Sequence, residues 1–423
     1  MGAVGASLRE AGADAEAVQL AGAPRGLGVA GRRFVFVLAW AVLGGAERHA
    51  LAVARQLFAE GAQVEVLALT DEDGRFRAAA EAEGIGWHPC RIEWRGGRAE
   101  KARELARLAV ALRRLRPDVV VPYCTRPNVL CGLVWRSTGA SLCVWNQQDV
   151  GSTRIGRRLL ARALRGTPLL IANSEAARDH LLLLGAVPDR VHVVANTPVE
   201  HVAESDGSEW RSRLGISRQA FVVTMLAHLH VGKDHDTLLR AWRKVVDRVG
   251  DGPVLLLAGR PAGGEHAVKA LAFDLALGSS VRFLDDVLDV GGLLAATDVG
   301  VLSSRGESAP NAVLESMAAS LPVVATDLPG IRELFGERQR SFLAPSGDAD
   351  GLALALLDLY ADADLRRTLG EENRRLIVER MRHPAGRAAA ELIAAALGAR
   401  LERDHDAVPA GSSTPAHAPA DLA

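Results

Sequence analysis

Two glutamates, Glu307 and Glu315, stand eight residues apart where an apolar segment gives way to a segment of helical character. The order of residues predicts a strand over 299–303, a loop that carries Glu307, and a helix that carries Glu315, with Pro310 in its first turn. Eight residues are about two helical turns, so both carboxylates can face one ligand. Glu315 could accept hydrogen bonds from two vicinal hydroxyls, such as those of a ribose.

The same junction has the features of an anion site. Free backbone N–H groups and the positive end of a helix dipole meet where the loop enters the helix, and this combination suits a diphosphate. Taken in isolation, Glu307 and Glu315 have a simpler interpretation, two exposed acids that the helix dipole favours. Only the sequence around the two glutamates favours the interpretation of a binding site over this simpler one.

Two further positions could contribute to such a site. Lys233 precedes a predicted helix, where its ammonium could pair with a diphosphate as a point charge. Gly44 and Gly45 form a turn after the first apolar strand, and glycine lets a backbone approach a phosphate or an acceptor because it has no Cβ. Each also has an ordinary interpretation, a solvated lysine at a helix start and a plain strand–helix turn.

The composition describes a globular chain of two domains. Its 423 residues exceed one ordinary core, and 48% hydrophobic with 24% charged residues is typical of packed proteins. The net charge of −1 gives no excess that would point to nucleic acid. The four cysteines include no CxxC pair, which indicates free thiols in a reducing compartment. No apolar run reaches the roughly 18–20 residues that a membrane span needs.

Apolar strands alternate with amphipathic helices along the chain, which predicts an α/β protein built of parallel βαβ units. One series begins at 33–38, and a second begins at 221–226 after a polar break near residue 200. We therefore predict two doubly wound, Rossmann-like domains that face a cleft at the carboxyl ends of their strands. The expected parts are a disordered leader 1–31, a first domain 32–200, a second domain 201–384, a helix 385–403 that packs back on the first domain, and a disordered tail 404–423.

In this context the sequence resembles family 4 of the retaining glycosyltransferases, which have the GT-B fold. The E-x7-E block continues into Ser-Leu-Pro-Val-Val-Ala-Thr at 320–326, where the family has G-x-P-V-V-A-T. Three further segments resemble the family in order, namely G-G-A-E at 44–47, V-V-A-N-T-P-V at 193–199 and the stretch 226–239 around Lys233. Together the resemblance covers residues 33–400.

The resemblance implies a nucleotide-sugar donor bound by the second domain. Glu307 would contact the donor sugar near the reacting carbon as the catalytic residue, and Glu315 would bind the nucleotide ribose. The other donor-site candidates are Gly44, Gly45, His228, Lys233, Arg260, Ser308 and Asn311. The first domain would bind the acceptor, with Asn128, Asn146 and Gln147 as candidates.

Two departures from the family pattern stand out. His228 occupies the position of the usual phosphate-binding arginine, and an imidazole carries a full charge only below its ordinary pKa of about 6.5. Diphosphate binding would then depend on pH or be shared with His230 or Arg260. The segment 146–148, Asn-Gln-Gln, stands where many members have a histidine beside the sugar. An amide there could still donate a hydrogen bond to a sugar hydroxyl.

The reaction implied by the resemblance is transfer of a hexose-type sugar from a nucleoside diphosphate, with uridine as the favoured base, to a hydroxyl acceptor with retention of configuration. Glycans, lipid-linked sugars and small metabolites all belong to this acceptor class, and polysaccharide biosynthesis is a typical setting. We expect a cytoplasmic enzyme without a cofactor, located at the inner face of the membrane if its acceptor is lipid-linked. The sequence leaves the oligomeric state open.

The sequence also contains a pattern that looks like a metal-binding motif. Asp71-Glu72-Asp73 matches the D-x-D motif of the other large glycosyltransferase fold, but Gly74 follows it and favours a surface turn. Asp285-Asp286 is interpreted in the same way. The resemblance implies metal independence, because Lys233 and helix dipoles can neutralise the leaving diphosphate.

Two rival functions remain open. One is a nucleotide-sugar 2-epimerase of the same architecture, against which the E-x7-E block argues. The other is a GT-B binding or scaffold protein without effective turnover. His228 and the segment 146–148 are the only features that favour it.

Overall fold

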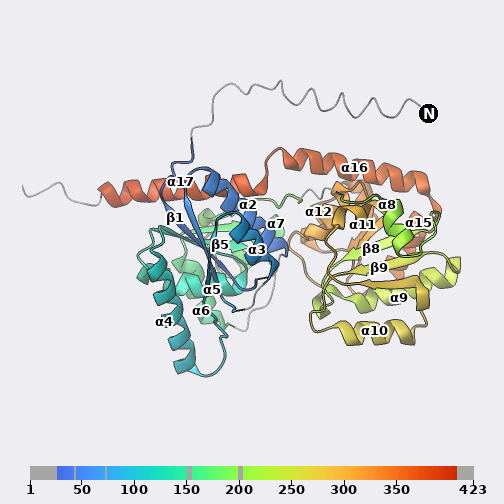
Figure 1. Ribbon diagram of the computed structural model, residues 1–423, viewed down its shortest axis with the longest axis horizontal. Helices are drawn as coiled ribbons and strands as arrows, with labels where there is room; N and C mark the ends of the chain where they lie inside the picture. Colours follow the sequence, from blue (N-terminus) through green and yellow to red (C-terminus); the bar gives the residue numbers. More distant parts are fainter. Residues whose placement is uncertain (1–25, 42–43, 72–73, 150–154, 199–202, 407–423) are drawn as a thin grey trace, which may run out of the picture.

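The computed structural model describes residues 26–41, 44–71, 74–149, 155–198 and 203–406. These residues form two α/β domains, each built on one parallel sheet (Figure 1). The first sheet has the strand order β3-β2-β1-β4-β5-β6-β7, and the second has the order β10-β9-β8-β11-β12-β13. Each order reverses at its first strand, so both sheets are doubly wound. The predicted α/β class with two such domains is confirmed.

The strands of the first sheet are β1 (Arg33–Leu38), β2 (Gln63–Ala68), β3 (Gly86–Pro89), β4 (Val119–Pro122), β5 (Leu142–Gln147), β6 (Leu169–Ala172) and β7 (Val191–Val193). Those of the second sheet are β8 (Val222–Leu226), β9 (Val254–Ala258), β10 (Val281–Leu284), β11 (Val299–Leu302), β12 (Val323–Thr326) and β13 (Leu343–Ala344).

The helices of the first domain are α2 (Gly45–Ala59), α3 (Arg75–Ala82), α4 (Arg98–Leu115), α5 (Thr125–Val134), α6 (Arg157–Gly166) and α7 (Glu175–Leu183). The second domain contains α8 (Gly207–Arg213), α9 (His235–Val249), α10 (Glu265–Asp274), α11 (Val290–Ala295), α12 (Asn311–Ala318), α13 (Pro329–Arg332), α14 (Glu337–Arg340), α15 (Ala349–Ala361) and α16 (Ala363–Met381). The last helix is α17 (Ala385–Asp406). Over the described residues, no helix combines the length and the apolar character needed to cross a membrane.

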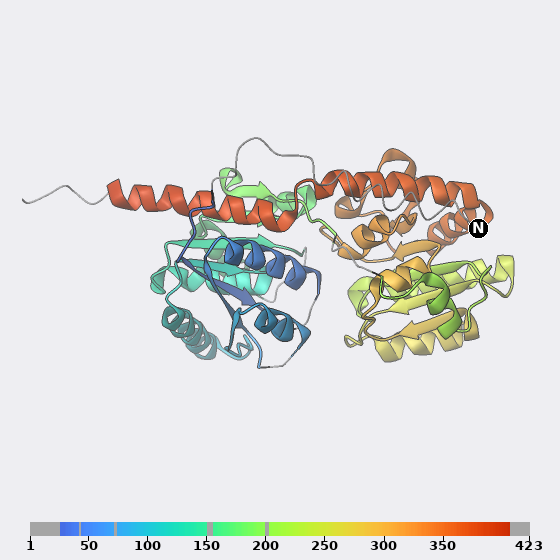
Figure 2. The same ribbon diagram turned by 45° about the horizontal axis from the view of Figure 1, so that its top comes forward.

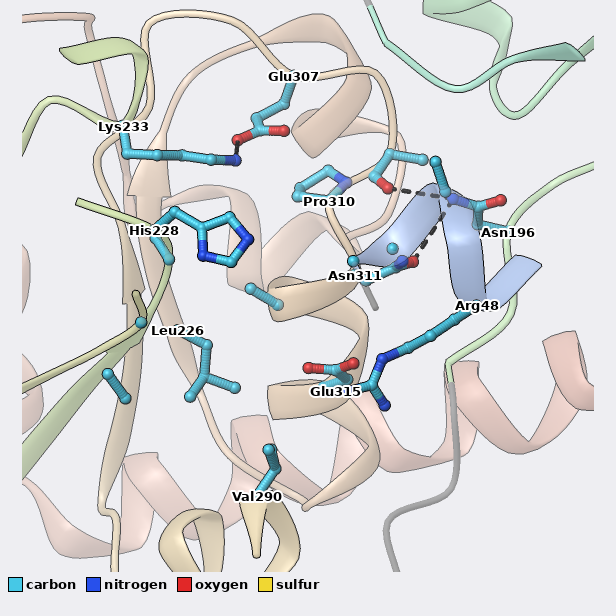
Figure 3. A pocket seen from close by; sticks show the side chains of 18 of the residues that line it. Arg48, Asn196, Leu226, His228, Lys233, Val290, Glu307, Pro310, Asn311 and Glu315 are labelled. Carbon is cyan, nitrogen blue, oxygen red and sulfur yellow. Dashed lines mark hydrogen bonds and ion pairs between the residues drawn. The ribbon is translucent and has the colours of Figure 1, made fainter. Parts of the chain in front are cut away.

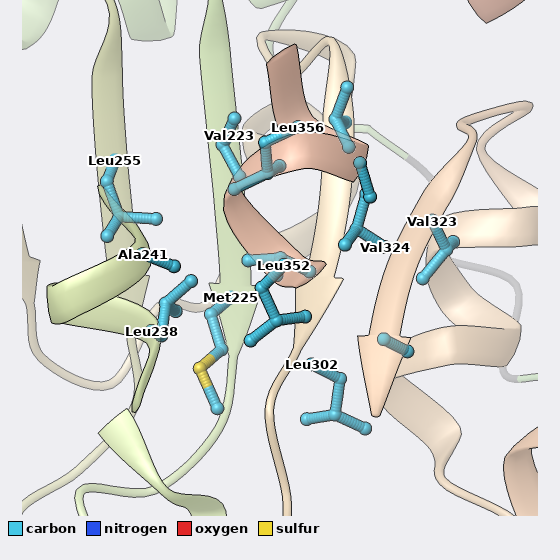
Figure 4. Packing of buried hydrophobic residues seen from close by; sticks show 14 of the residues in the cluster. Val223, Met225, Leu238, Ala241, Leu255, Leu302, Val323, Val324, Leu352 and Leu356 are labelled. Atoms are coloured by element: carbon cyan, nitrogen blue, oxygen red, sulfur yellow. The ribbon is translucent and has the colours of Figure 1, made fainter. Parts of the chain in front are cut away.

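The strands are apolar along their length because helices cover both faces of each sheet. In β1, Phe34 and Phe36 pack in a cluster with residues of α2 and α17, whereas the alternate residue Val35 packs with residues of α4 and α5. The second sheet is built in the same way, and Val223 and Met225 of β8 lie among residues of α9 and α15 (Figure 4). With the faces covered, the carboxyl edges of the two sheets are the places left for a ligand.

The last helix returns from the second domain to the first, where it lies along α2 (Figures 1 and 2). Near the crossing, the guanidinium of Arg380 donates to the carbonyl of Asn196 (3.3 Å). The backbone N–H of Ala385 donates to the hydroxyl of Thr197 (3.3 Å). Farther along α17, Ile393 lies in the core of the first domain. The chain therefore crosses between the domains twice, and the two crossings touch.

Two expected boundaries need correction. Residues 26–31 are structured rather than part of a disordered leader, because Val29 is 1% exposed and belongs to the core of the first domain. At the other end, α17 extends through Asp406, into the expected disordered tail. The remainder of the predicted leader, 1–25, and of the tail, 407–423, lies outside the described residues.

Candidate active site

A pocket lies between the two domains at the carboxyl ends of their strands (Figure 3). Its first wall is the turn after β1 together with the end of β5, and its second wall consists of the loops after β8 to β11 together with α12. Most of the residues predicted to bind the donor are brought together here, namely Gly44, Gly45, His228, Lys233, Glu307, Ser308, Asn311 and Glu315.

Glu307 and Lys233 meet at one end of this pocket. The Lys233 ammonium forms an ion pair with Oε1 of Glu307, and the Ser304 hydroxyl donates to the same oxygen (2.6 Å). The Glu307 side chain is 12% exposed and that of Lys233 is 31% exposed. A short 3-10 turn, Val231–Lys233, places the lysine directly before α9. The pair holds both charged groups at the pocket wall, where either could turn toward a ligand.

His228 follows β8 and faces the same pocket (Figure 3). Burial lowers the pKa of its imidazole, and the nearby cations Arg260 and Lys233 lower the pKa further. Asp286 acts in the opposite direction with a smaller effect. The imidazole is therefore neutral at pH 7 in the free protein.

Glu315 lies in α12, and the sequence places this helix against the pocket. β11 and α12 pack closely because Gly300 has no side chain; a Cβ there would lie 2.7 Å from the hydroxyl oxygen of Ser316. Pro310 caps α12 in an extended conformation rather than lying in its first turn as predicted, and the helix begins at Asn311. Glu307 and Glu315 then line the same pocket, one from the loop and one from the helix.

The loop between Glu307 and α12 contacts the first domain. The hydroxyl of Ser308 donates to the carbonyl of Gln148 (3.1 Å) and accepts from the amide of Asn173 (3.1 Å). Asn196 donates to the side-chain oxygen of Asn311 (3.5 Å). The loop that positions Glu307 is thus tied to the opposite wall of the cleft.

Glycines permit close approaches at two positions around this loop, one between the domains and one within the second domain. A Cβ on Gly45 would lie 2.1 Å from the amide nitrogen of Asn311, across the cleft. A Cβ on Gly330 would lie 1.9 Å from the carbonyl oxygen of Ser308. The first contact joins α2 to α12, so the predicted Gly-Gly turn is a point where the two domains touch.

Sequence reasoning missed Arg48 and Asn196 and interpreted Asp286 as part of a surface turn, but all three line the pocket. Gln148, from the segment 146–148, lines it as well. Arg48 directly follows the G-G-x-E turn, so its place in the first turn of α2 was a signal that could have identified it. Asn196 lies in a segment that resembled the family but received no role. Arg260, in contrast, was predicted to bind the donor but is not among the residues that line the pocket. It lies beside the pocket, with its Nε 3.5 Å from a carboxylate oxygen of Asp286.

The acceptor-side prediction is corrected, because Asn128, Asn146 and Gln147 do not face the pocket. All three are 0% exposed. The amide of Asn128 donates to the carbonyl of Asn146 (2.7 Å), and that of Gln147 donates to the hydroxyl of Thr125 (3.1 Å). β5 is an interior strand, so helices cover its polar side chains on both faces. These residues fix the end of β5, and the next residue, Gln148, reaches the pocket.

The D-x-D segment is only partly described. Asp71 lies 3.8 Å from Arg91 on the outer side of the first domain, and Glu72-Asp73 lies outside the described residues. Within the described ranges, no three His, Cys, Asp or Glu residues gather in a group that could hold a metal ion.

Solved structures with this fold are GT-B glycosyltransferases. HepE from Anabaena, in complex with UDP-glucose, matches with a TM-score of 0.73 at 20% identity, covering 87% of this chain and 99% of that one. WaaG, a glycosyltransferase involved in lipopolysaccharide biosynthesis, matches with a TM-score of 0.69 at 17% identity, covering 85% of this chain and 99% of that one. The predicted GT-B fold is confirmed.

The family follows from the sequence. Residues 43–197 match the family model of Glycosyltransferase Family 4, and residues 220–362 match that of Glycosyl transferases group 1. The two matches together cover most of the chain, which belongs to this glycosyltransferase family.

Curated relatives are similar over parts of their length. The putative glycosyltransferase EpsD of Bacillus subtilis is 32% identical over 166 residues, which are 39% of this chain and 43% of the relative. N-acetyl-alpha-D-glucosaminyl L-malate synthase of Bacillus anthracis is 25% identical over 252 residues, 54% of this chain and 65% of the relative. The lipopolysaccharide core biosynthesis glycosyltransferase LpsE of Rhizobium meliloti is 30% identical over 215 residues, 51% of this chain and 60% of the relative. The chain spans between 43% and 65% of the length of these relatives.

Proposed function

We propose that this chain is a retaining glycosyltransferase that moves a sugar from a nucleoside diphosphate, with UDP as the favoured leaving group, to a hydroxyl acceptor. The observation that supports this most strongly is a single interdomain pocket that gathers His228, Lys233, Glu307 and Glu315. These side chains offer a cation, a hydrogen-bond donor and two carboxylates, which are the groups that a diphosphate, a sugar and a ribose require.

Each residue has a proposed part in binding the donor. Glu315 accepts hydrogen bonds from the ribose hydroxyls. Glu307 lies at the sugar, and Lys233 exchanges its contact with Glu307 for the diphosphate. As the bond between the anomeric carbon and the diphosphate breaks, negative charge grows on the leaving group, and the ammonium of Lys233 stabilises it. The acceptor oxygen forms the new bond to the anomeric carbon, and the hydroxyl proton passes to the oxygen of the departing diphosphate.

The acceptor would enter from the first domain, beside the Gly44–Gly45 turn and Gln148, which line the opposite wall. The names of two relatives support a hydroxyl acceptor that is either small or part of a glycan, because one is an N-acetyl-alpha-D-glucosaminyl L-malate synthase and the other a lipopolysaccharide core biosynthesis glycosyltransferase. A lipid-linked acceptor would bring the chain to the inner face of a membrane. Closure of the cleft over both substrates would exclude water and protect the donor from hydrolysis.

An assay of nucleoside diphosphate release tests this function. UDP-, GDP- and ADP-sugars are first screened by thermal shift, since a bound donor raises the melting temperature. The donor that binds is then incubated with and without a panel of hydroxyl acceptors. Acceptor-dependent release of the diphosphate supports the proposal. Conversion of the donor sugar without acceptor would indicate a 2-epimerase, and binding without conversion by any acceptor would indicate a scaffold protein.

A further inference from the structure

The second domain offers a diphosphate few uncommitted positive charges. Lys233 is paired with Glu307, and Arg260 is held beside Asp286. His228 is neutral at pH 7, because burial lowers the pKa of its imidazole. Asp286 also attracts the guanidinium of Arg75 from the first domain (3.2 Å). A nucleoside diphosphate carries at least two negative charges, so a site of this kind needs a further cation.

Arg48 lines the pocket from the first domain and is partly buried. It forms no ion pair with a carboxylate among the residues that the structure describes. Figure 3 shows its side chain reaching from α2 across the pocket, with the guanidinium directed toward Glu315. In this view the guanidinium lies beside Glu315, in the same pocket that His228 lines and that the proposed donor would occupy.

The fold fixes Arg48 in this place. The backbone N–H of Arg48 donates to the carbonyl of Gly44 (3.0 Å), which closes the first turn of α2. The neighbouring Gly45 lies so close to Asn311 that a Cβ would overlap with its amide nitrogen. This contact sets the first turn of α2 against α12, and the turn presents Arg48 to the pocket.

We propose that Arg48 is a phosphate-binding residue that the first domain supplies, and that it takes the place of the cation missing at His228. This inference rests on the proposed function, because it assigns a role within the same donor site. Since His228, Lys233 and Glu315 belong to the second domain, the diphosphate then binds charged side chains of both domains at once. A nucleoside diphosphate therefore favours the closed arrangement of the domains over an open one.

The test compares Arg48→Gln with the parent and with Arg55→Gln as a matched control. Arg55 lies two turns farther along α2, outside this pocket, where it pairs with Glu83 and its side chain is 60% exposed. Calorimetry measures the affinity of each protein for UDP, UMP and uridine. We expect Arg48→Gln to weaken UDP binding by about 10- to 100-fold, to weaken UMP binding less, and to leave uridine binding unchanged. Arg55→Gln should bind all three as the parent does.

Two further variants keep the outcome decisive. Arg48→Lys retains the charge and should lose less UDP affinity than Arg48→Gln. Introducing His228→Arg into Arg48→Gln should restore UDP affinity, because the missing charge returns from the other wall. Equal UDP affinity in Arg48→Gln and the parent would overturn the inference, as would an equal loss for uridine and UDP. If the parent binds no nucleoside diphosphate at all, the proposed function fails and this inference fails with it.

Discussion

The protonation of His228 depends on what occupies the pocket. In the free protein, burial and the cations Arg260 and Lys233 lower the pKa of the imidazole, and Asp286 only partly offsets them. A bound diphosphate raises that pKa, because negative charge favours the imidazolium. Binding therefore takes up a proton, and affinity falls as the pH rises through the pKa of the bound state. We expect UDP affinity to decline by up to about tenfold per pH unit over that range.

Titrations of UDP between about pH 5.5 and about pH 8.5 check this prediction, because that interval brackets an imidazole. His228→Arg should give a flat profile with tighter binding, since arginine stays charged throughout. His228→Ala should also give a flat profile, but with weaker binding. A flat profile in the parent would show that His228 does not contact the phosphates as a cation. His266→Gln, at an exposed position of α10 outside the pocket, serves as the control.

Glu307 should affect turnover more than binding. It lies at the pocket wall with Lys233 and the Ser304 hydroxyl, near the proposed position of the sugar. Glu307→Gln retains the size of the side chain and removes its charge. We expect kcat to fall roughly 10- to 100-fold, with the donor affinity changed much less. Steady-state kinetics and calorimetry on the same protein distinguish the two effects, and a normal kcat would reduce the E-x7-E block to a marker of the fold.

Glu315 should have the reverse effect. Its carboxylate lies on α12 facing the pocket, where it would accept hydrogen bonds from two ribose hydroxyls. Glu315→Ala should weaken UDP binding by roughly 1–3 kcal/mol. A 2′-deoxy nucleoside diphosphate should show a smaller difference between parent and variant than UDP does. Calorimetry that gives the same UDP affinity for both proteins would remove Glu315 from the donor site.

The sequence could predict Glu307, Glu315 and Lys233 as neighbours, because a strand, a loop and a helix are local features that bring them to one edge. It could not predict whether the Asn146 side chain faces the pocket, because a polar side chain at the end of a strand can face either a pocket or a covering helix. Only the packing on both faces of β5 decides between these, and it buries the residue. Arg48 was missed for a related reason, since its neighbours in the pocket come from the other domain.

At the scale of the elements, the start of α11 depends on Asp289, the residue that caps the N-terminus of this helix. The carboxylate accepts hydrogen bonds from the N–H of Gly292 (2.9 Å), the N–H of Glu204 (3.1 Å), the indole of Trp210 (2.8 Å) and the hydroxyl of Ser205. Burial acts to raise the pKa of Asp289, but these hydrogen bonds lower it well below its usual range. The carboxylate thus joins the start of α11 to α8 and to the end of the interdomain linker.

Asp289→Asn should destabilise the second domain by about 1–3 kcal/mol at neutral pH. A lowered pKa in the folded state gives stability that is present above the unfolded pKa of about 3.9 and is lost as the pH falls below it. Urea unfolding followed by tryptophan fluorescence checks both statements, and the difference between parent and variant should shrink below pH 4. Asp285→Asn, at an exposed neighbour, is the control. Equal stability at neutral pH would show that the hydrogen bonds of Asp289 contribute nothing.

Periodicity alone predicted the order of strands and helices, because the strands are continuously apolar and the helices amphipathic. The limits of elements were harder to predict. Pro310 suits a first helical turn by its fixed backbone angle, yet it is the N-cap residue of α12, and a residue at that position has an extended backbone. Val29 looked like part of an Ala/Gly-rich leader, and only the core that it enters reveals it as structural.

At the scale of the whole molecule, we expect closure of the cleft between the two domains to depend on the close contact between Gly45 and Asn311. A methyl group on Gly45 would lie 2.1 Å from the Asn311 amide nitrogen, so in Gly45→Ala the Asn311 side chain must turn aside and its contact with Asn196 is disturbed. Because small misplacements of reacting groups are costly, kcat should fall about 10- to 100-fold while the melting temperature stays near that of the parent. Small-angle scattering should show less compaction on addition of UDP. Gly398→Ala, which meets open space in α17, should behave as the parent does.

The return of α17 to the first domain has a consequence for biosynthesis. A ribosome makes the first domain before the second, but the core of that first domain includes Ile393 and Leu397. Until α17 leaves the exit tunnel, the apolar side of α2 against which it packs has no cover. The domain that is translated first is therefore completed last, and the nascent chain must keep an unfinished apolar surface soluble while the second domain, residues 203–384, is added. Such an intermediate is a natural client for a chaperone that binds exposed apolar surface during synthesis.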